Sequence, residues 1–179
     1  MEHFSVQRKR RILVIGSSGS GKSTLARSLG EALALPVVHL DRLYWTPGWI
    51  ARPREEFDAL LARELAKDAW IIDGNYGRTL ETRLARADCV IRFRFSRLRC
   101  EWGVLRRVLA TYGKVRPDMG EGCPERFDRE FIRWIWEFPK KDGAKADAVL
   151  ARTPQVPVIT LRSRRQADAL LREARDGRI

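Results

Sequence analysis

One stretch of eight residues, GSSGSGKS at positions 16–23, constrains the fold of this chain more than any other feature. It matches the phosphate-binding pattern G-x-x-x-x-G-K-[ST] at every fixed position. The three glycines leave the backbone open, so that several N–H groups can converge on a polyphosphate. The lysine brings a charge to the β- and γ-phosphates, and the final serine suits the magnesium ion that bridges them. The pattern therefore predicts a site for a nucleoside triphosphate.

The residues on either side of this loop support the interpretation. Residues 11–15, with four apolar residues after Arg11, are typical of a buried strand, and residues 24–35 carry leucines at four-residue spacing, which predicts an amphipathic helix. Strand, glycine loop and helix are the context in which the pattern binds phosphate, and the helix adds its positive end. The alternative, an ordinary glycine-rich turn, would not need this context. We expect the nucleotide to contact Gly16, Ser17, Ser18, Gly19, Ser20, Gly21, Lys22, Ser23 and Thr24.

Length and composition indicate one domain. The chain has 179 residues, of which 44% are hydrophobic. We expect a flexible basic tail over residues 1–10 and a single domain over residues 11–179. Prolines or charges break each apolar stretch before it reaches the length of a membrane span, and the N-terminus lacks the apolar core of a secretory signal. These features predict a cytoplasmic protein, monomer or dimer, without a membrane partner.

The three cysteines, Cys89, Cys100 and Cys123, do not form a recognisable set. No C-x-x-C pair occurs, and only His3 and His39 are present to complete a metal site. The sequence therefore favours neither a disulfide framework nor a zinc site, and we expect the cysteines to be reduced packing residues.

The formal net charge of +12 suits a polyanionic partner, either a nucleotide or a nucleic acid. The charge is concentrated between residues 92 and 117, where Glu101 is the single acidic residue. The cations of this segment are Lys114 and Arg92, Arg94, Arg97, Arg99, Arg106, Arg107 and Arg116. Charge alone does not distinguish the two kinds of partner.

Strand-like and helix-like segments alternate along the rest of the chain. The pattern predicts strands at residues 37–40, 70–72, 89–95 and 156–161, and helices at 55–67, 80–87, 98–110, 125–138 and 144–151. A capping box, SRRQ at positions 163–166, opens a terminal helix. The alternation predicts an α/β fold with a parallel sheet and crossover helices.

Residues 111–124 are rich in glycine, proline and charge, which is typical of a loop. Together with the arginines before it, this segment predicts a mobile lid over roughly residues 106–124. An apolar stripe follows at helical spacing, and we expect it to be core without a chemical role. Its members are Phe127, Phe131, Trp134, Ile135 and Phe138.

Two aspartates stand where predicted strands end, the position at which parallel sheets place their ligands. Asp73 follows an apolar run and is a candidate magnesium ligand; the alternative is a turn-forming Asp-Gly pair. Asp41 precedes a group of aromatic residues and is a candidate for orienting an acceptor hydroxyl or holding magnesium-bound water. Its alternative is a helix cap or turn. We expect His39, inside the strand, to be a packed histidine.

Arg106, Arg107 and Arg116 flank or lie in the predicted lid. Guanidinium groups at these positions would close over the β- and γ-phosphates and stabilise charge in the transition state of phosphoryl transfer. The alternative for each is a solvated basic surface.

Several segments together resemble one bacterial family. They are the phosphate loop, HLDRLYW at 39–45, PGW at 47–49, IDGNY at 72–76, RPDM at 116–119 and CPERF at 123–127. The family is described as adenylate-kinase-like P-loop ATPases and often labelled DNA topology modulation protein (FlaR-like); the resemblance runs from residue 11 to about residue 174. It implies a three-layer, nucleoside-monophosphate-kinase-like fold with a five-stranded parallel sheet, helices on both faces, an acceptor region after the second strand and an arginine-bearing lid.

The resemblance to adenylate kinases is incomplete at the acceptor region. Asp73 and Gly74 match their Asp-Gly pair after the third strand, but adenylate kinases continue with an aromatic residue, proline and arginine, whereas this chain continues with Asn75, Tyr76 and Gly77. Asp41 is more similar to an aspartate of shikimate and gluconate kinases, whose acceptors are hydroxyl groups. These departures argue against AMP as the acceptor.

The leading hypothesis is an ATP- and Mg²⁺-dependent small-molecule kinase. Lys22 and the loop amides would hold the triphosphate, Ser23 and Asp73 would bind magnesium, Asp41 would orient the acceptor, and the arginines would stabilise the γ-phosphoryl group. Two alternatives remain open: an ATPase that binds nucleic acid, although no helix-turn-helix, zinc finger or RNA-binding consensus occurs, and a nucleotide-dependent switch without useful turnover.

Overall fold

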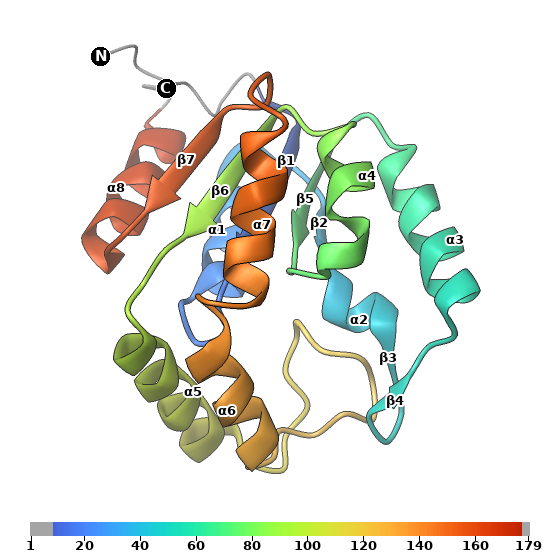
Figure 1. Cartoon of the computed structure of the whole chain (residues 1–179), viewed down its shortest axis with the longest axis vertical. Helices are drawn as coiled ribbons and strands as arrows, with labels where there is room; N and C mark the ends of the chain where they lie inside the picture. Colours follow the sequence, from blue (N-terminus) through green and yellow to red (C-terminus); the bar gives the residue numbers. More distant parts are fainter. Residues whose placement is uncertain (1–8, 177–179) are drawn as a thin grey trace.

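Five parallel strands form the main sheet of the computed structural model, which describes residues 9–176. Their order across the sheet is β2 (Val37–His39), β5 (Trp70–Asp73), β1 (Arg11–Gly16), β6 (Cys89–Phe93) and β7 (Val158–Leu161), as Figure 1 shows. The three middle strands are almost wholly buried, which explains their continuous apolar sequences. Because every pair of neighbours is parallel, the carboxyl ends of all five strands meet at one edge.

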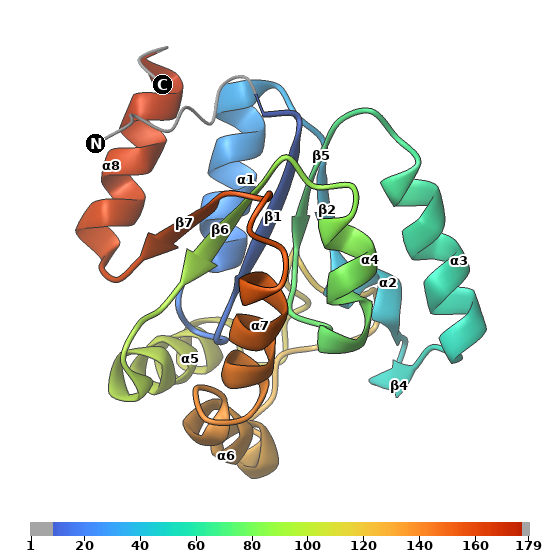
Figure 2. The same cartoon turned by 45° about the horizontal axis from the view of Figure 1, so that its top comes forward.

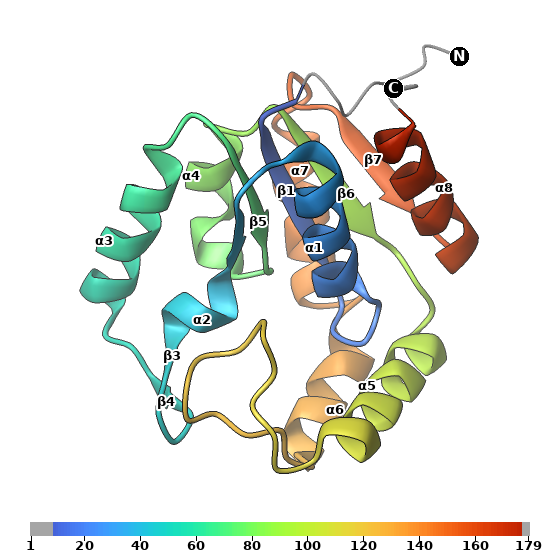
Figure 3. The ribbon, with the colours of Figure 1, turned by 180° about the vertical axis from the view of Figure 1, so that it is seen from behind.

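Helices cover both faces of this sheet, as Figures 1 and 3 show from opposite sides. On one face, α1 (Lys22–Leu33) and α8 (Arg164–Arg175) share an apolar cluster with Ile12 and Ile91 of the strands. On the other face, α3 (Arg54–Leu65), α4 (Leu80–Leu84) and α7 (Asp142–Ala151) share a second cluster with Leu13 and Ile72. The predicted α/β fold, with a five-stranded parallel sheet between two helical layers, is confirmed.

The remaining elements gather beyond the carboxyl edge of the sheet, as Figure 2 shows for α5 (Arg97–Thr111) and α6 (Arg129–Glu137). Across from them lie the short helix α2 (Leu40–Tyr44) and a hairpin of β3 (Trp45–Thr46) and β4 (Ile50–Ala51). The loop 112–128 joins the two groups, since Gly48 N–H donates to the Gly122 carbonyl at 2.9 Å and Trp49 Nε1 donates to the Pro124 carbonyl at 3.1 Å. These elements frame the space above the phosphate loop.

The structure corrects several predicted boundaries. Helix α5 ends at Thr111, one residue beyond the predicted helix 98–110, and residues 112–128 form the loop that follows. Helix α6 begins at Arg129 rather than at residue 125, because the Asp128 side chain caps it by accepting from Phe131 N–H. Neither α2 nor the β3–β4 hairpin was expected.

Other predictions concern the ends and interior of the chain. Ser163 caps α8, as the capping box predicts, by accepting from Gln166 N–H. All three cysteines are buried and unpaired, as expected of packing residues. Within residues 9–176, no helix is long and apolar enough to cross a membrane. Most of the predicted basic tail, residues 1–8, lies outside the described residues.

Candidate active site

The phosphate loop connects β1 to α1 and takes backbone conformations that favour glycine. Gly16, Gly19 and Gly21 have φ of 142°, 76° and 91°. Gly21 is also the N-cap of α1, and the first turn of this helix contains no acidic residue. Since no carboxylate competes there, the amide groups at the start of α1 suit an anion.

Helix α5 packs directly on this loop. A Cβ atom on Gly19 would lie 2.0 Å from the Cys100 carbonyl oxygen, and one on Gly103 would lie 2.1 Å from the Gly19 carbonyl oxygen. Two glycines facing each other therefore allow the backbones of loop and helix to touch. This contact fixes the position of the arginines that α5 carries.

We expect Gly103→Ala to lower the free energy of unfolding by about 2 kcal/mol, although alanine is the better helix former by about 1 kcal/mol. The added methyl group collides with loop backbone, which has no flexible end to move aside. Urea denaturation measures the effect. Gly77→Ala, where a Cβ would meet nothing within 4 Å, is the matched control; equal stability of the two variants would contradict the contact.

The serines of the loop have different surroundings. Ser20 is buried and donates from Oγ to the Ser17 carbonyl at 2.7 Å, which braces the loop. Ser17 is also buried, and its hydroxyl oxygen has no partner. Ser23 and Thr24 line the large cavity described next, whereas Ser18 lines a second cavity.

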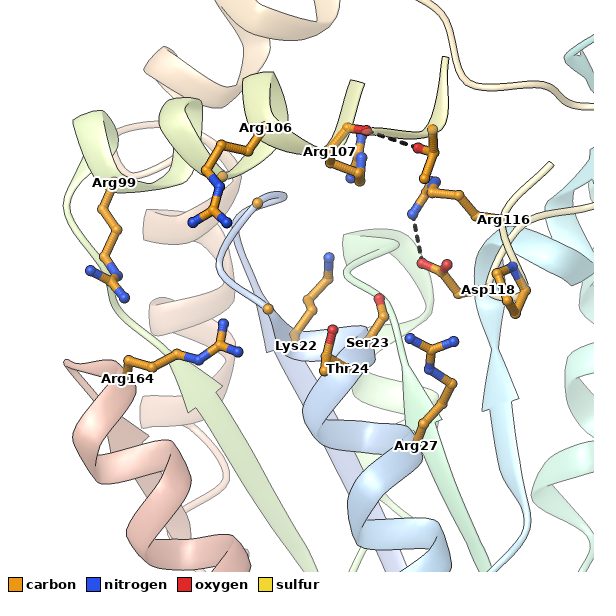
Figure 4. Close-up of a pocket in the computed structure, with 15 residues that line it drawn as sticks. Lys22, Ser23, Thr24, Arg27, Arg99, Arg106, Arg107, Arg116, Asp118 and Arg164 are labelled. Carbon is orange, nitrogen blue, oxygen red and sulfur yellow. Dashed lines mark hydrogen bonds and ion pairs between the residues drawn. The ribbon is translucent and has the colours of Figure 1, made fainter. Parts of the chain in front are cut away.

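A cavity of about 650 Å³ opens over the N-terminal end of α1. We name it the cationic cavity because seven cations line it against one acid, Asp118, among the residues that the structure describes. Figure 4 shows them converging from α1, α5, α8 and the loop after α5. They are Lys22, Arg27, Arg99, Arg106, Arg107, Arg116 and Arg164. This excess of positive charge suits the negatively charged phosphates of a nucleoside triphosphate.

A second cavity, of about 430 Å³, lies beside the first. We name it the aromatic cavity, because its walls include Trp45, Trp49, Tyr76, Phe131 and Trp134. The last two belong to the stripe expected to be plain core; they are partly buried and pack against the core cluster, but they also line this cavity. Ile135 and Phe138 of the same stripe are buried as expected, whereas Phe127 is exposed, so the prediction is wrong for Phe127. Sequence periodicity cannot tell a face that lines a cavity from one that packs on neighbours.

In the described part of the chain, the two cavities share five lining residues; four of them were predicted to be site residues and Asp118 was not, and the predicted magnesium ligand Asp73 lines neither cavity. Lys22, Ser23, Arg107, Arg116 and Asp118 line both. Arg106 is exposed and lines the cationic cavity, whereas Asp41 lines the aromatic cavity. A group held in one cavity can therefore reach a group held in the other beside Lys22.

Asp41 stands in the first turn of α2 and accepts a hydrogen bond from the Tyr76 hydroxyl at 2.7 Å. Burial raises the pKa of Asp41 above its ordinary value, and the Lys22 charge and the Tyr76 hydrogen bond oppose this increase. Burial and the Asp41 charge raise the pKa of Tyr76, so its hydroxyl stays a donor. An aspartate in this setting can bind and deprotonate a hydroxyl group.

Asp73 lies at the end of β5 and is almost fully buried. One of its carboxylate oxygens is 2.9 Å from Nδ1 of His39 in the neighbouring strand, whereas the other, Oδ1, has no partner. His39 is packed, as predicted, but its contact with Asp73 was not foreseen. Burying a carboxylate oxygen without a partner costs free energy, and a magnesium ion or its bound water at Oδ1 would remove this cost.

A buried arginine that sequence reasoning missed holds the turn after β5. Arg83 in α4 is fully buried and donates to the backbone carbonyls of Gly74 at 2.9 Å, Tyr76 at 3.1 Å and Asn75. Burial lowers the pKa of Arg83 to about 9, so it stays charged at neutral pH. Nothing local in the sequence separates this arginine from the many exposed ones.

We expect Arg83→Met to lower the free energy of unfolding by about 3 kcal/mol, because three buried carbonyl oxygens lose a charged donor. Thermal and urea denaturation measure this effect. Arg83→Lys keeps the charge but has fewer hydrogen-bond donors, so its free energy of unfolding should lie between those of the unsubstituted protein and Arg83→Met. A melting temperature unchanged in Arg83→Met would show that the turn does not depend on this guanidinium.

Asn75, in the same turn, contacts the phosphate loop. Its side-chain oxygen accepts from Gly16 N–H at 2.9 Å, and its amide nitrogen donates to the Gly16 carbonyl at 2.8 Å. Because Tyr76 contacts Asp41, the turn at residues 74–76 connects the loop to that carboxylate.

Two of the predicted lid arginines bind carboxylates of the following loop. Arg107 and Arg116 approach Oε2 of Glu125 with their Nε atoms at 3.0 Å and 2.7 Å, and Arg116 also donates to Asp118 at 2.7 Å. Both carboxylates are buried. The sequence motifs that contain them, RPDM and CPERF, supported the family resemblance without revealing this pairing.

Comparison with known proteins defines the class of fold. No protein-family model and no curated protein matches the chain. A gluconokinase from Sinorhizobium meliloti 1021 superposes with a TM-score of 0.55 over 94% of this chain and 90% of its own, at 16% identity. A shikimate kinase from Bacteroides thetaiotaomicron gives 0.56 over 94% and 97% at 18% identity.

A shikimate kinase from Acinetobacter baumannii, solved in complex with shikimate, gives 0.58 over 97% of both chains at 14% identity. The chain therefore has the P-loop kinase fold. At these identities the comparison establishes the fold alone, and the DNA topology label receives no support from it.

Proposed function

We propose that this protein is a Mg²⁺-dependent kinase that transfers the γ-phosphoryl group of ATP to a hydroxyl group of a small acceptor. The observation that carries the proposal is the meeting of the two cavities at Lys22, Ser23, Arg107 and Arg116. ATP would occupy the cationic cavity and the acceptor the aromatic cavity, which brings the γ-phosphorus beside the residues shared by both.

The phosphate loop and Lys22 hold the triphosphate in this scheme. Amides at the start of α1 donate to phosphate oxygens, and Lys22 neutralises charge on the β- and γ-phosphates. Ser23 and Asp73 are the residues that would hold magnesium, directly or through water. The ion supplies charge neutralisation of the β- and γ-oxygens.

Asp41 orients the acceptor and takes its proton. The acceptor oxygen forms a bond to the γ-phosphorus, the bond from the γ-phosphorus to the β,γ-bridging oxygen breaks, and ADP leaves with that oxygen. The hydroxyl proton passes to the Asp41 carboxylate, which Tyr76 keeps in position. Arg106, Arg107 and Arg116 stabilise the charge on the transferring group.

The distribution of basic charge favours this function over nucleic-acid binding. Of the seven arginines between residues 92 and 117, four line the cationic cavity: Arg99, Arg106, Arg107 and Arg116. A fifth, Arg92, forms an ion pair with Asp147. Most of these arginines therefore line the cationic cavity or pair with a carboxylate of the same chain.

Incubation with γ-labelled ATP, Mg²⁺ and a panel of nucleosides, nucleoside monophosphates, sugars and hydroxy acids tests the proposal. We expect the label to move to an acceptor hydroxyl. Label that appears only as inorganic phosphate would contradict a kinase, and release stimulated by DNA in a salt-sensitive manner would support the nucleic-acid ATPase instead. Binding of ATP without any release would support a switch.

A further inference from the structure

The charged groups around the two cavities differ in balance. Five carboxylates and four cations line the aromatic cavity. The carboxylates are Asp41, Asp118, Glu125, Asp128 and Asp142, and the cations are Lys22, Arg107, Arg116 and Arg126. The cationic cavity has seven cations and one carboxylate. These counts cover the residues that the structure describes, and they give the aromatic cavity an excess of negative charge, which increases once Lys22 serves ATP.

The arginines nearest the meeting point are already paired. Glu125, with 5% of its side chain exposed, lies against both Arg107 and Arg116, and Asp118, with 9% exposed, holds the other side of Arg116. Glu125 lines the aromatic cavity and not the cationic cavity, so an anionic acceptor would meet its buried carboxylate beside Arg107 and Arg116, whereas the γ-phosphoryl group would reach these arginines from the cationic cavity.

The remaining cation, Arg126, lies at the exposed rim of the aromatic cavity. Its guanidinium carbon is 5.4 Å from the ring centre of Trp49, and its NH2 group is 3.9 Å from an Asp128 oxygen. The side chain is more than half exposed, so water screens its charge. It does not supply a buried anion site.

The aromatic side chains also favour a neutral or cationic ligand over an anionic one. Phe131 and Trp134 stack nearly parallel, with ring centres 5.7 Å apart, and Trp45 and Trp49 meet edge to face at 5.6 Å. The negative face of an aromatic ring attracts cations and packs on flat or apolar surfaces of neutral molecules. Trp134 Nε1 donates to Asp142 at 2.8 Å, which leaves the rings as the main contact surface.

We infer that the acceptor is a neutral or cationic hydroxyl compound with a flat or apolar face, such as a nucleoside or an amino sugar, and that the anionic counterparts of such compounds are excluded. The inference rests on the proposed function and names its substrate class. It separates this protein from kinases whose acceptor carries a carboxylate or phosphate.

Matched acceptors test the inference on the full-length protein. Each neutral or cationic compound is paired with an anionic relative: adenosine with AMP, and glucose and glucosamine with gluconate. We expect kcat/KM at least tenfold higher for the accepted neutral or cationic compound than for its anionic relative. Faster phosphorylation of AMP or gluconate would overturn the inference and leave the proposed function standing. Transfer to no compound of the set would count against both.

Removing a buried carboxylate should change this preference. In Glu125→Gln, Arg107 and Arg116 lose a negatively charged partner. We therefore expect the ratio of kcat/KM for the neutral acceptor to kcat/KM for the anionic acceptor to fall at least tenfold. Asp118→Asn makes the same charge change and gives a second measurement if the first variant does not fold. Glu31→Gln, exposed on α1, is the matched control and should leave the ratio unchanged. An unchanged ratio in both cavity variants would overturn the inference.

Discussion

An Asp41→Asn variant is expected to bind ATP as tightly as the natural protein and to transfer its γ-phosphoryl group about 1000-fold more slowly. Asparagine fills the same space and still accepts from Tyr76, but it cannot take the acceptor proton. Calorimetry with Mg²⁺ and ATP measures the first quantity, and single-turnover transfer of labelled phosphate measures the second. Turnover that survives the substitution would remove the role assigned to Asp41.

The pH dependence of transfer gives a further expectation for the same carboxylate. Because burial raises the pKa of Asp41, the transfer rate should fall as the pH decreases through a value above the ordinary one for aspartate. Tyr76→Phe removes a hydrogen bond that favours the ionised form, so its profile should shift to higher pH by about one unit. A profile that does not move in this variant would indicate that another group sets it.

A Lys22→Ala variant is expected to bind ATP about 100-fold more weakly, because a charge-assisted contact with phosphate contributes about 2–3 kcal/mol. The expected loss should appear in the dissociation constant measured by calorimetry at moderate ionic strength with Mg²⁺ present. Lys67→Ala changes the net charge by the same amount at an exposed position just after α3 that lines neither cavity, and it is the control.

An equal loss of affinity in the two lysine variants would show that ATP is drawn by general charge alone. Unchanged affinity in both would contradict a phosphate site at the start of α1. Either result is distinguishable from unfolding, because circular dichroism and the melting temperature are recorded on the same samples.

The features predicted well from the sequence depend on neighbours along the chain. The phosphate loop, the buried strands and the cap at Ser163 are each encoded within a few residues. The parallel direction of the strands follows from the alternation of strands and helices along the chain. Asp41 and Asp73 could be proposed as site residues because the sequence shows a carboxylate after an apolar run. Their contacts with Tyr76 and His39 could not be predicted from it.

The features missed depend on contacts between distant segments. Glu125 approaches Arg107 across eighteen positions, and Asn75 reaches Gly16 across fifty-nine. Arg83 has the same local sequence character as exposed arginines, and only the fold buries it.

The turn at residues 74–76 has a consequence for how such a protein can change. It contacts the phosphate loop through Asn75 and Asp41 through Tyr76, so in the proposed reaction three adjacent residues would set the gap that the phosphoryl group crosses. Apart from Tyr76, the aromatic walls proposed to select the acceptor come from the β3–β4 hairpin and α6, which are separate segments. Selection for new acceptors can therefore rebuild the walls while the reaction geometry stays intact.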